Sequence, residues 1–479
     1  MSLTSPLFFA FLASVVVAYN ISASVSYRRA VLGLANACFI GSYLTDTTQA
    51  LPLLGFLLLG YGCVRVLEVW KSAIALALGV LSVLGCYVFL KRFSFFDDLG
   101  HIPFPYLTIG LSYILFRILH IMVDVRSGDL EERINPLAFF RYTCNFLCFV
   151  SGPIQRYQDF RNTDGLAAYD LDSAKVFDAF SRIITGYVKF VIIAATAEYG
   201  FSFLKPQLLQ AGDLPMLKLY GLYAAAASLY TVYLYYNFSG YMDIVIGSGI
   251  LIGQDLPENF DRPFSARTFL EFWQRWHMTL SQWFKFYLFN PLLMRLMSWF
   301  PSSALTAYLG VLAFFVTFLV MGIWHGTTAV FVIYGLLMGA GASVNKLWQV
   351  ACTARLGKKR YRALTDQIAY IYLSRGITIA YFVLALTCLW VPELSDFDRL
   401  IGALGLAGIL AGFFAIGGAF ALFWFIADRM VLHLTTPTLL LSVRDSLIGR
   451  NLSLASKMMA IVVVTTLLHK SPDFVYKAF

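Results

Sequence analysis

The chain has 479 residues, of which 59% are hydrophobic and 13% are charged, and this charged share is about half that of a typical soluble domain. The composition excludes an ordinary soluble protein and indicates an integral membrane protein. Apolar runs of roughly 20 residues favour spanning helices over a barrel, whose strands alternate over roughly 10 residues. The formal net charge of +9 is typical of cytoplasmic loops in a polytopic protein, so it does not indicate nucleic-acid binding.

The apolar runs predict an all-α polytopic membrane protein, with about 11 transmembrane helices in a single integral membrane domain over residues 1–479. The first run, Leu7–Ala18, is followed by Arg28 and Arg29, which favours an outside N-terminus over a signal peptide. The other principal runs are Ala30–Leu44, Leu51–Val69, Ser72–Leu90, Phe104–Val123, Ile183–Ala197, Leu217–Tyr236, Ile244–Ile252, Leu309–Ile323, Ala329–Ala342, Ile368–Trp390, Leu400–Ile426 and Leu452–Leu468.

Polar residues interrupt this pattern in the first half of the chain. Alternation of the spans puts Val125–Arg133 on the cytoplasmic side. Phe139–Pro153 is too short to span and polar groups follow it at once, so we expect it to be re-entrant or to line a cavity. Asn237–Asp243 separates two apolar runs, and an Asp at that place indicates a polar interior.

Aromatic and apolar side chains recur at helical spacing from Ser265 to Asn290, with charged and polar residues between them. This pattern predicts an amphipathic helix rather than a spanning one. Its tryptophans are typical of an interfacial aromatic belt. His277 lies on the flank of the apolar face, where an anchoring role explains it less well.

His325 follows the apolar run Leu309–Ile323 and precedes another, Ala329–Ala342. An ionisable residue at membrane depth must face protein or a water-filled cavity, and it indicates a functional site. The structural alternative is a neutral histidine that caps the break between two helices.

The most basic segment is Lys346–Arg362, which holds six lysines and arginines and no acidic residue. We expect a cytoplasmic loop here. An anionic nucleotide such as coenzyme A could also meet this segment, although topology alone explains its charge. The seven cysteines lie mostly in apolar runs without a CxxC pair, so the sequence signals neither a disulfide framework nor a zinc site.

A histidine is suited to accept a proton from a hydroxyl near neutral pH. A Ser-His-Asp arrangement would need a serine on a sharp turn such as GxSxG, whereas Gly247–Gly249 lacks that pattern and lies in an apolar run. Direct transfer by base catalysis therefore fits the sequence better than a covalent relay.

Several motifs are distributed over about half of the chain, within 104–341. They are Pro105–Ser112, Gly152–Arg156, Asn237–Asp243, Glu258–Phe260, Pro263–Phe264, Phe272–Ser281 and Gly322–Gly326. Together these motifs resemble the membrane-bound O-acyltransferases, and within them the bacterial branch of alginate O-acetyltransferase and the teichoic-acid D-alanyl transferase, so we take 104–341 as the catalytic core.

The resemblance implies that His325 is the catalytic histidine and that His277 is the second one. It also implies spanning helices around a central funnel with a thin, partly re-entrant floor, which would explain polar breaks at Gly152, Asn237 and Gly326. The chain departs from the alginate branch at Met294–Phe300 and at Leu389–Pro392. The resemblance therefore implies the type of reaction that this chain catalyses, but it identifies neither the acceptor nor the surface that binds a partner.

These observations favour an O-acyltransferase of the bacterial inner membrane. It would move an acyl group from a cytoplasmic thioester to a hydroxyl of an exported polysaccharide or envelope polymer, and acetyl is the acyl group that we expect. Acylation of a lipid or a protein is the alternative acceptor chemistry. A secondary transporter would also place broken helices and ionisable residues at midplane, but the chain lacks an internal repeat.

In this interpretation His325 abstracts the hydroxyl proton, and His277 orients a substrate or stabilises the developing oxyanion. The expected substrate-binding residues are Trp324, Trp276, Asp243, Gln155 and Arg156. No metal and no tightly bound cofactor are expected, because the donor is itself a thioester of coenzyme A or of an acyl carrier protein. Expected partners are the bilayer, the glycan or polymer acceptor, and an extracytoplasmic acyltransferase or glycan-synthesis protein.

Overall fold

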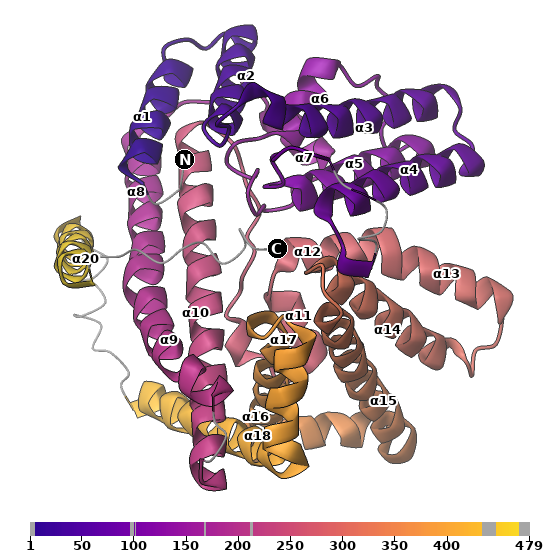
Figure 1. The fold of residues 1–479 in the computed structure, drawn as a ribbon, viewed down its shortest axis with the longest axis vertical. Helices are drawn as coiled ribbons and strands as arrows, with labels where there is room; N and C mark the ends of the chain where they lie inside the picture. Colours follow the sequence, from indigo (N-terminus) through magenta and orange to yellow (C-terminus); the bar gives the residue numbers. More distant parts are fainter. Residues whose placement is uncertain are drawn as a thin grey trace. The chain divides into compact units, whose positions relative to one another are not determined.

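The computed structural model describes residues 5–95, 100, 102–166, 169–210, 214–433 and 447–468. The described chain is built of helices, with an isolated antiparallel bridge between Phe260 and Trp276. Contacts divide the chain into two compact units, which are described separately (Figure 1). The first unit holds residues up to Phe190 together with Phe238–Glu258, and the second holds Val191–Asn237 and the described residues from Asn259 onward.

In the first unit, polar N-cap residues set several helix starts: the side chains of Ser5, Ser24, Ser72, Asn135 and Asp172 each accept a hydrogen bond from a backbone N–H in the first turn. Helices α3, α4 and α5 pack against one another, and α6 packs against α2, α3 and α5 (Figure 1). The elements are α1 (Pro6–Asn20), α2 (Val25–Gly41), η1 (Thr47–Ala50), α3 (Leu51–Val69), α4 (Ala73–Lys91), α5 (Leu111–Ser127), α6 (Pro136–Thr143), α7 (Tyr157–Thr163) and α8 (Ser173–Tyr187).

Two elements contribute residues to both units, the π-helical η3 (Val188–Ala194) and the 36-residue α10 (Met216–Leu251). In the second unit α14 packs along α15, and α16 packs along α18 (Figure 1). The elements of this unit are α9 (Ala195–Leu209), η4 (Pro263–Ser265), α11 (Phe269–Arg275), α12 (Met278–Phe284), η5 (Lys285–Phe289), α13 (Asn290–Trp299), α14 (Thr306–Trp324), α15 (Val330–Thr365), α16 (Ile368–Ala385), α17 (Thr387–Trp390), α18 (Leu394–His433) and α20 (Leu447–Leu468).

Among the described residues, six helical segments are long and apolar enough to cross a membrane. This confirms an all-helical membrane protein at the coarse level, while the number of about 11 crossings and the central funnel stay predictions. The six segments are Thr47–Val69, Ala73–Lys91, Thr306–Trp324, Val330–Thr365, Ile368–Trp390 and Leu394–Met430.

The predicted break at Asn237–Asp243 is wrong, because α10 continues through it without interruption. The polar residues of this segment do not compete with the helical backbone. Instead the side chains of Ser239 and Asp243 are bonded to Lys189, so the backbone hydrogen bonds of the helix are kept.

Two further predictions need correction. The amphipathic helix expected over Ser265–Asn290 is divided, since α11 ends at Arg275 and α12 begins at Met278. The basic segment Lys346–Arg362 is not a loop but the continuation of α15, since lysine, arginine, alanine and leucine are good helix formers. Its one departure from helical geometry is Gly357, whose φ of +76° a glycine adopts without strain.

Candidate active site

The break between α11 and α12 is made by a short antiparallel pairing of Asn259–Asp261 with Arg275–Met278. Two backbone hydrogen bonds of 2.9 Å join these segments, and each connects the first residue of one to the last residue of the other. The pairing leaves His277 with a φ of +45°, in the left-handed region that few residues other than glycine adopt. Such strain is found most often at functional sites.

Asn259 holds both the ring of His277 and the start of α12. Its Oδ1 accepts hydrogen bonds from His277 Nδ1 at 3.2 Å, from the backbone N–H of Thr279 at 3.0 Å and from Thr279 Oγ1 at 2.9 Å. An amide oxygen only accepts, so the proton of the neutral His277 ring lies on Nδ1 and the lone pair lies on Nε2.

The other end of the Asn259 amide has unmet hydrogen-bonding capacity. The residue is fully buried, and Nδ2 has no hydrogen-bonding partner among the described residues. A buried amide that keeps two N–H donors unsatisfied costs free energy, and such a group in a native structure calls for a functional explanation. A substrate oxygen beside His277 would supply the missing acceptor.

His325 lies at the break between α14 and α15. It is the C-cap residue of α14, its backbone N–H donates to the carbonyl of Gly322 at 3.1 Å, and α15 begins only at Val330. The break predicted at Gly326 is therefore confirmed. The side chain is buried, and its ring lies 4.8 Å from the ring of Trp324 and 5.6 Å from that of Tyr334, measured between centroids.

Two glycines fix this turn by letting α14 and α15 touch through their backbones. A Cβ on Gly322 would lie 2.1 Å from Cα of Gly335, and a Cβ on Gly335 would lie 2.5 Å from the carbonyl oxygen of Leu319. No side chain fits at either position. The tight crossing sets the direction in which the chain leaves α14, and with it the place of His325.

The two histidines belong to the same unit and lie within electrostatic reach of each other. Both are buried, and both lie outside the candidate membrane spans. Burial lowers the pKa of His325 to about 3, and burial with a smaller contribution from His325 lowers the pKa of His277 well below its usual range. Burial thus disfavours the charged form of both rings, and a neutral imidazole can accept a proton.

The two predicted tryptophans have different surroundings. Trp324 directly precedes His325 and contacts its ring. Trp276 precedes His277 and is buried in an aromatic cluster that packs beside the strained residue, and its role in substrate binding stays a prediction. The rings around Trp276 are those of Tyr235, Phe260, Phe264, Phe272 and Phe382, with centroids 5.0 to 6.2 Å away.

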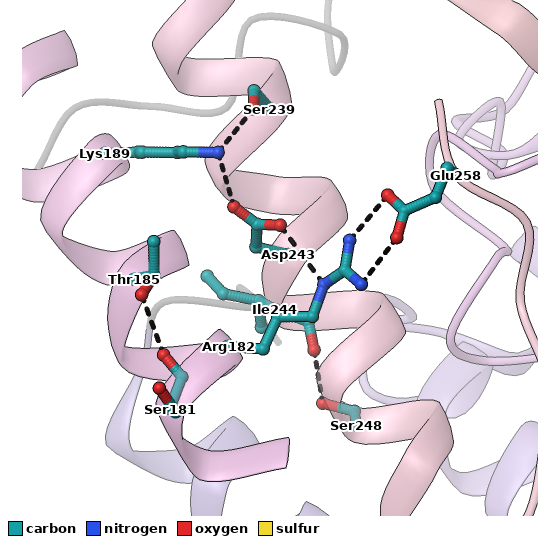
Figure 2. Close-up of polar contacts among 9 residues, drawn as sticks. All are labelled: Ser181, Arg182, Thr185, Lys189, Ser239, Asp243, Ile244, Ser248 and Glu258. Atoms are coloured by element: carbon teal, nitrogen blue, oxygen red, sulfur yellow. Dashed lines mark hydrogen bonds and ion pairs between the residues drawn. The ribbon is translucent and has the colours of Figure 1, made fainter. Parts of the chain in front are cut away.

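The other three predicted substrate-binding residues lie in the first unit. Figure 2 shows Asp243 on α10 between two cations, with Lys189 Nζ at 2.6 Å and Arg182 Nε at 3.2 Å. Arg182 also forms a bidentate pair with Glu258, with both N–O distances at 2.6 Å. The carboxylate of Asp243 is thus engaged in an ion-pair network, which explains how a charged residue is accommodated in an apolar helix.

Gln155 and Arg156 lie at the start of α7. Gln155 is buried, and its Nε2 donates to the carbonyl of Asp255 at 2.9 Å. Arg156 is exposed and is the N-cap residue of α7. Nothing in these contacts tests a role in substrate binding, so that role stays a prediction for both residues.

Sequence reasoning gave no role to Asn259, although Glu258–Phe260 was among the recognised motifs. An amide placed 18 residues before the histidine carries no signal in the sequence, because only the antiparallel pairing brings the two together. As for metals, the described His, Cys, Asp and Glu side chains form no group of three that could hold an ion.

Residues 127–386, more than half of the chain, match the sequence profile of the membrane-bound O-acyltransferase family. Among curated proteins, the chain is 30% identical over 252 residues to the "Probable alginate O-acetylase" of Pseudomonas fluorescens, covering 52% of this chain and 46% of that protein. It is 27% identical over 333 residues to the protein of the same description from Pseudomonas aeruginosa, covering 66% of this chain and 59% of that protein.

A second group of relatives carries a different description. The chain is 32% identical over 245 residues to the "Teichoic acid D-alanyltransferase" of Streptococcus thermophilus, covering 50% of this chain and 57% of that protein. The chain thus spans about half the length of the curated relatives it matches.

Proposed function

Because the chain belongs to the membrane-bound O-acyltransferase family, we propose that it transfers an acyl group from a thioester donor to a hydroxyl of an exported polysaccharide or another cell-envelope polymer. Acetyl is the acyl group that we propose. The printed descriptions of its relatives name an acetylation of alginate and a D-alanylation of teichoic acid. Both descriptions name the transfer of an acyl group to a polymer, and this shared chemistry supports the proposal.

The observation that carries the proposal is an unsatisfied buried amide beside two buried histidines of one unit: Oδ1 of Asn259 is bonded to His277, and its Nδ2 has no hydrogen-bonding partner among the described residues. Specific contacts fix the position of each ring. The strained backbone and the amide of Asn259 hold His277, and the close crossing of α14 and α15 at two glycines sets the position of His325. An imidazole beside a buried amide donor fits base-assisted transfer to a hydroxyl, in which the imidazole takes the proton and the amide stabilises the carbonyl oxygen.

In the proposed reaction His325 takes the proton of the acceptor hydroxyl while its oxygen attacks the thioester carbonyl carbon. The tetrahedral intermediate collapses, the carbon–sulfur bond breaks, and the leaving thiolate receives the proton from the imidazolium of His325. The ester and the free thiol are the products, and His325 returns to its neutral form. General-base help of this kind contributes about 10²- to 10⁴-fold in rate.

The tautomer of His277 limits the hydrogen bonds that its ring can make to a substrate. With the proton on Nδ1 bonded to Asn259, the neutral ring presents a lone pair on Nε2, so it accepts a hydrogen bond from a hydroxyl and does not donate one to an oxyanion. His277 therefore orients the acceptor in this proposal. The N–H groups of Asn259 Nδ2 are the nearby donors suited to a carbonyl oxygen that gains charge.

The donor and the acceptor are proposed to approach from opposite faces of the bacterial inner membrane. The donor is a cytoplasmic thioester of coenzyme A or of an acyl carrier protein. The acceptor polymer lies outside, where a second acyltransferase or a glycan-synthesis protein would be the partner that hands the polymer on.

Turnover in detergent tests the proposed function. The purified full chain is supplied with acetyl-coenzyme A, and free thiol is measured with and without an acetylatable polysaccharide. We expect thiol release that grows with the acceptor and ester formation on the polymer. A secondary transporter would need a sealed vesicle and a gradient, so the absence of any thioester turnover in detergent, with transport in vesicles, would contradict the proposal.

A further inference from the structure

The first unit contains a pocket of about 640 Å³ that the proposed reaction does not use. It lies among the N-terminal half of α2, the segment before α6, and α6 and α7. Its lining is dominated by one type of charge. Four arginines line it, Arg29, Arg133, Arg141 and Arg161, against one aspartate, Asp164.

The ion pairs in the pocket leave an excess of positive charge. Arg141 forms a bidentate pair with Asp164 at 2.9 and 2.7 Å, and Arg29 Nε lies 3.2 Å from the same carboxylate. Arg161 pairs with Glu132, which lies outside the lining, at 2.7 Å. Four guanidinium groups against these two carboxylates leave a net charge of +2 (4 − 2).

Arg133 supplies the most available cation of the pocket. Its side chain is exposed, and among the described residues it has no hydrogen bond and no ion pair. Arg29 uses only Nε in its contacts with Asp164, so its two terminal nitrogens point to no described acceptor. A planar guanidinium with spare N–H donors is well matched to the oxygens of a phosphate group.

An apolar rim adjoins these cations. Leu34 on α2 and Leu137 on α6 both line the pocket, and each is 67% exposed. The predicted topology puts Arg29, after the first span, and Arg133, after the fifth, on the cytoplasmic side, which agrees with their lining the same pocket. Guanidinium groups beside exposed leucines on the cytoplasmic side of the membrane match a lipid, in which the phosphate and the acyl chains are adjacent.

We propose that this pocket binds the headgroup of an anionic phospholipid of the cytoplasmic leaflet, with Arg29 and Arg133 on the phosphodiester and Leu34 and Leu137 against the first carbons of the acyl chains. A phosphate of coenzyme A offers the same anionic chemistry. The leucines favour the lipid, because two long acyl chains next to the phosphate bury more apolar surface against an exposed apolar rim than the amide-containing arm of coenzyme A does.

The test uses the purified full chain in detergent and measures lipid binding by native mass spectrometry with dioleoylphosphatidylglycerol. Dioleoylphosphatidylcholine, which has the same acyl chains and no net charge, is the reference lipid. We expect clear preference for phosphatidylglycerol, and we expect Arg29→Gln/Arg133→Gln to weaken its binding roughly tenfold or more, since each basic side chain near an anionic lipid contributes measurably.

The matched control is Arg355→Gln/Lys359→Gln, which removes two exposed charges from the end of α15. This control should leave binding of phosphatidylglycerol nearly unchanged. Equal losses in both double variants would mean general surface attraction and would overturn the proposal. So would equal binding of the two lipids, or a pocket variant that weakens binding of coenzyme A while phosphatidylglycerol binding is kept.

Folding is checked by thermal melting of each variant. Should the double variant fail to fold, Arg133→Gln alone decides the question, because Arg133 makes no ion pair among the described residues and its loss leaves Asp164 paired. Unchanged binding of phosphatidylglycerol in that single variant, beside an unchanged control, contradicts the proposal.

Discussion

Oδ1 of Asn259 and Nδ1 of His277 lie 3.2 Å apart, and this contact decides which nitrogen of the imidazole carries the proton. The same oxygen also accepts two hydrogen bonds from Thr279, so it is held in place independently of the histidine. Asn259 thus acts on the proposed chemistry in two ways, by fixing a tautomer and by presenting an amide N–H.

Asn259→Ala should lower kcat about 10²-fold, because the ring of His277 would lose the contact that holds it, and a misplacement of a catalytic group by about 1 Å lowers the rate by about that factor. The pH dependence of turnover should also change, since the tautomer of His277 is no longer fixed. Thr279→Val is the control, because it removes one donor to the same oxygen and leaves the histidine contact. A fall in melting temperature without any change in turnover per folded molecule would assign Asn259 a structural role only.

His325→Ala should abolish acyl transfer, with a loss of at least ~10²-fold, while the chain stays folded. His120→Ala is the matched control. His120 is a buried histidine whose Nε2 lies 2.9 Å from Oη of Tyr142 and accepts the backbone N–H of Tyr157 at 3.2 Å, so its loss should lower stability instead. Initial rates of thiol release and thermal melting separate the two effects. If the His325 variant kept more than about a tenth of the rate, the general-base role would be excluded.

Gly322→Ala should damage both stability and transfer, because the added methyl would meet the backbone of Gly335 at 2.1 Å. Overpacking of this kind costs roughly 1–3 kcal/mol or more, and relief of the clash would displace the turn that carries His325. Gly310→Ala on the same helix is the control, since nothing lies within 4 Å of its Cβ. Similar melting temperatures for both variants would show that the crossing is looser than described.

Asp243→Asn should lower the stability of the chain by roughly 1–3 kcal/mol, because it removes charged hydrogen bonds to Lys189 and Arg182. Asp396→Asn is the control, since its pair with Arg399 is exposed and such pairs contribute about 0–1 kcal/mol. Denaturation midpoints give the comparison. An increase in the KM for the acceptor with unchanged stability would instead favour the substrate-binding role predicted from the sequence.

The sequence predicted those parts of the fold that depend on long apolar runs. Leu51–Val69 and Ile368–Trp390 were placed to the residue or nearly so, since a span is defined by composition over many positions. The break at Gly326 was also predicted correctly, because a histidine and a glycine between two apolar runs leave few other arrangements.

Two of the three errors share one physical cause, which is that tertiary contacts override local pattern, whereas the helix over Lys346–Arg362 follows from the local helix propensity of its residues. Polar residues at Ser239 and Asp243 suggested a broken helix, yet side-chain partners distant in sequence satisfy them. The amphipathic periodicity around His277 suggested one helix, yet a short strand-like pairing with Asn259–Asp261 divides it. Such partners cannot be recognised from the local sequence.

The length of α15 has a consequence for the bilayer. The helix runs from Val330 to the kink at Gly357, and at 1.5 Å per residue these residues span about 40 Å, more than a hydrocarbon core of about 30 Å. The apolar part of the helix ends before Lys346, so the surplus length is the basic segment, and the glycine at the kink lets the turns beyond it change direction without backbone strain. We therefore expect the residues beyond Gly357 to change direction without strain reaching His325, which lies before the start of α15.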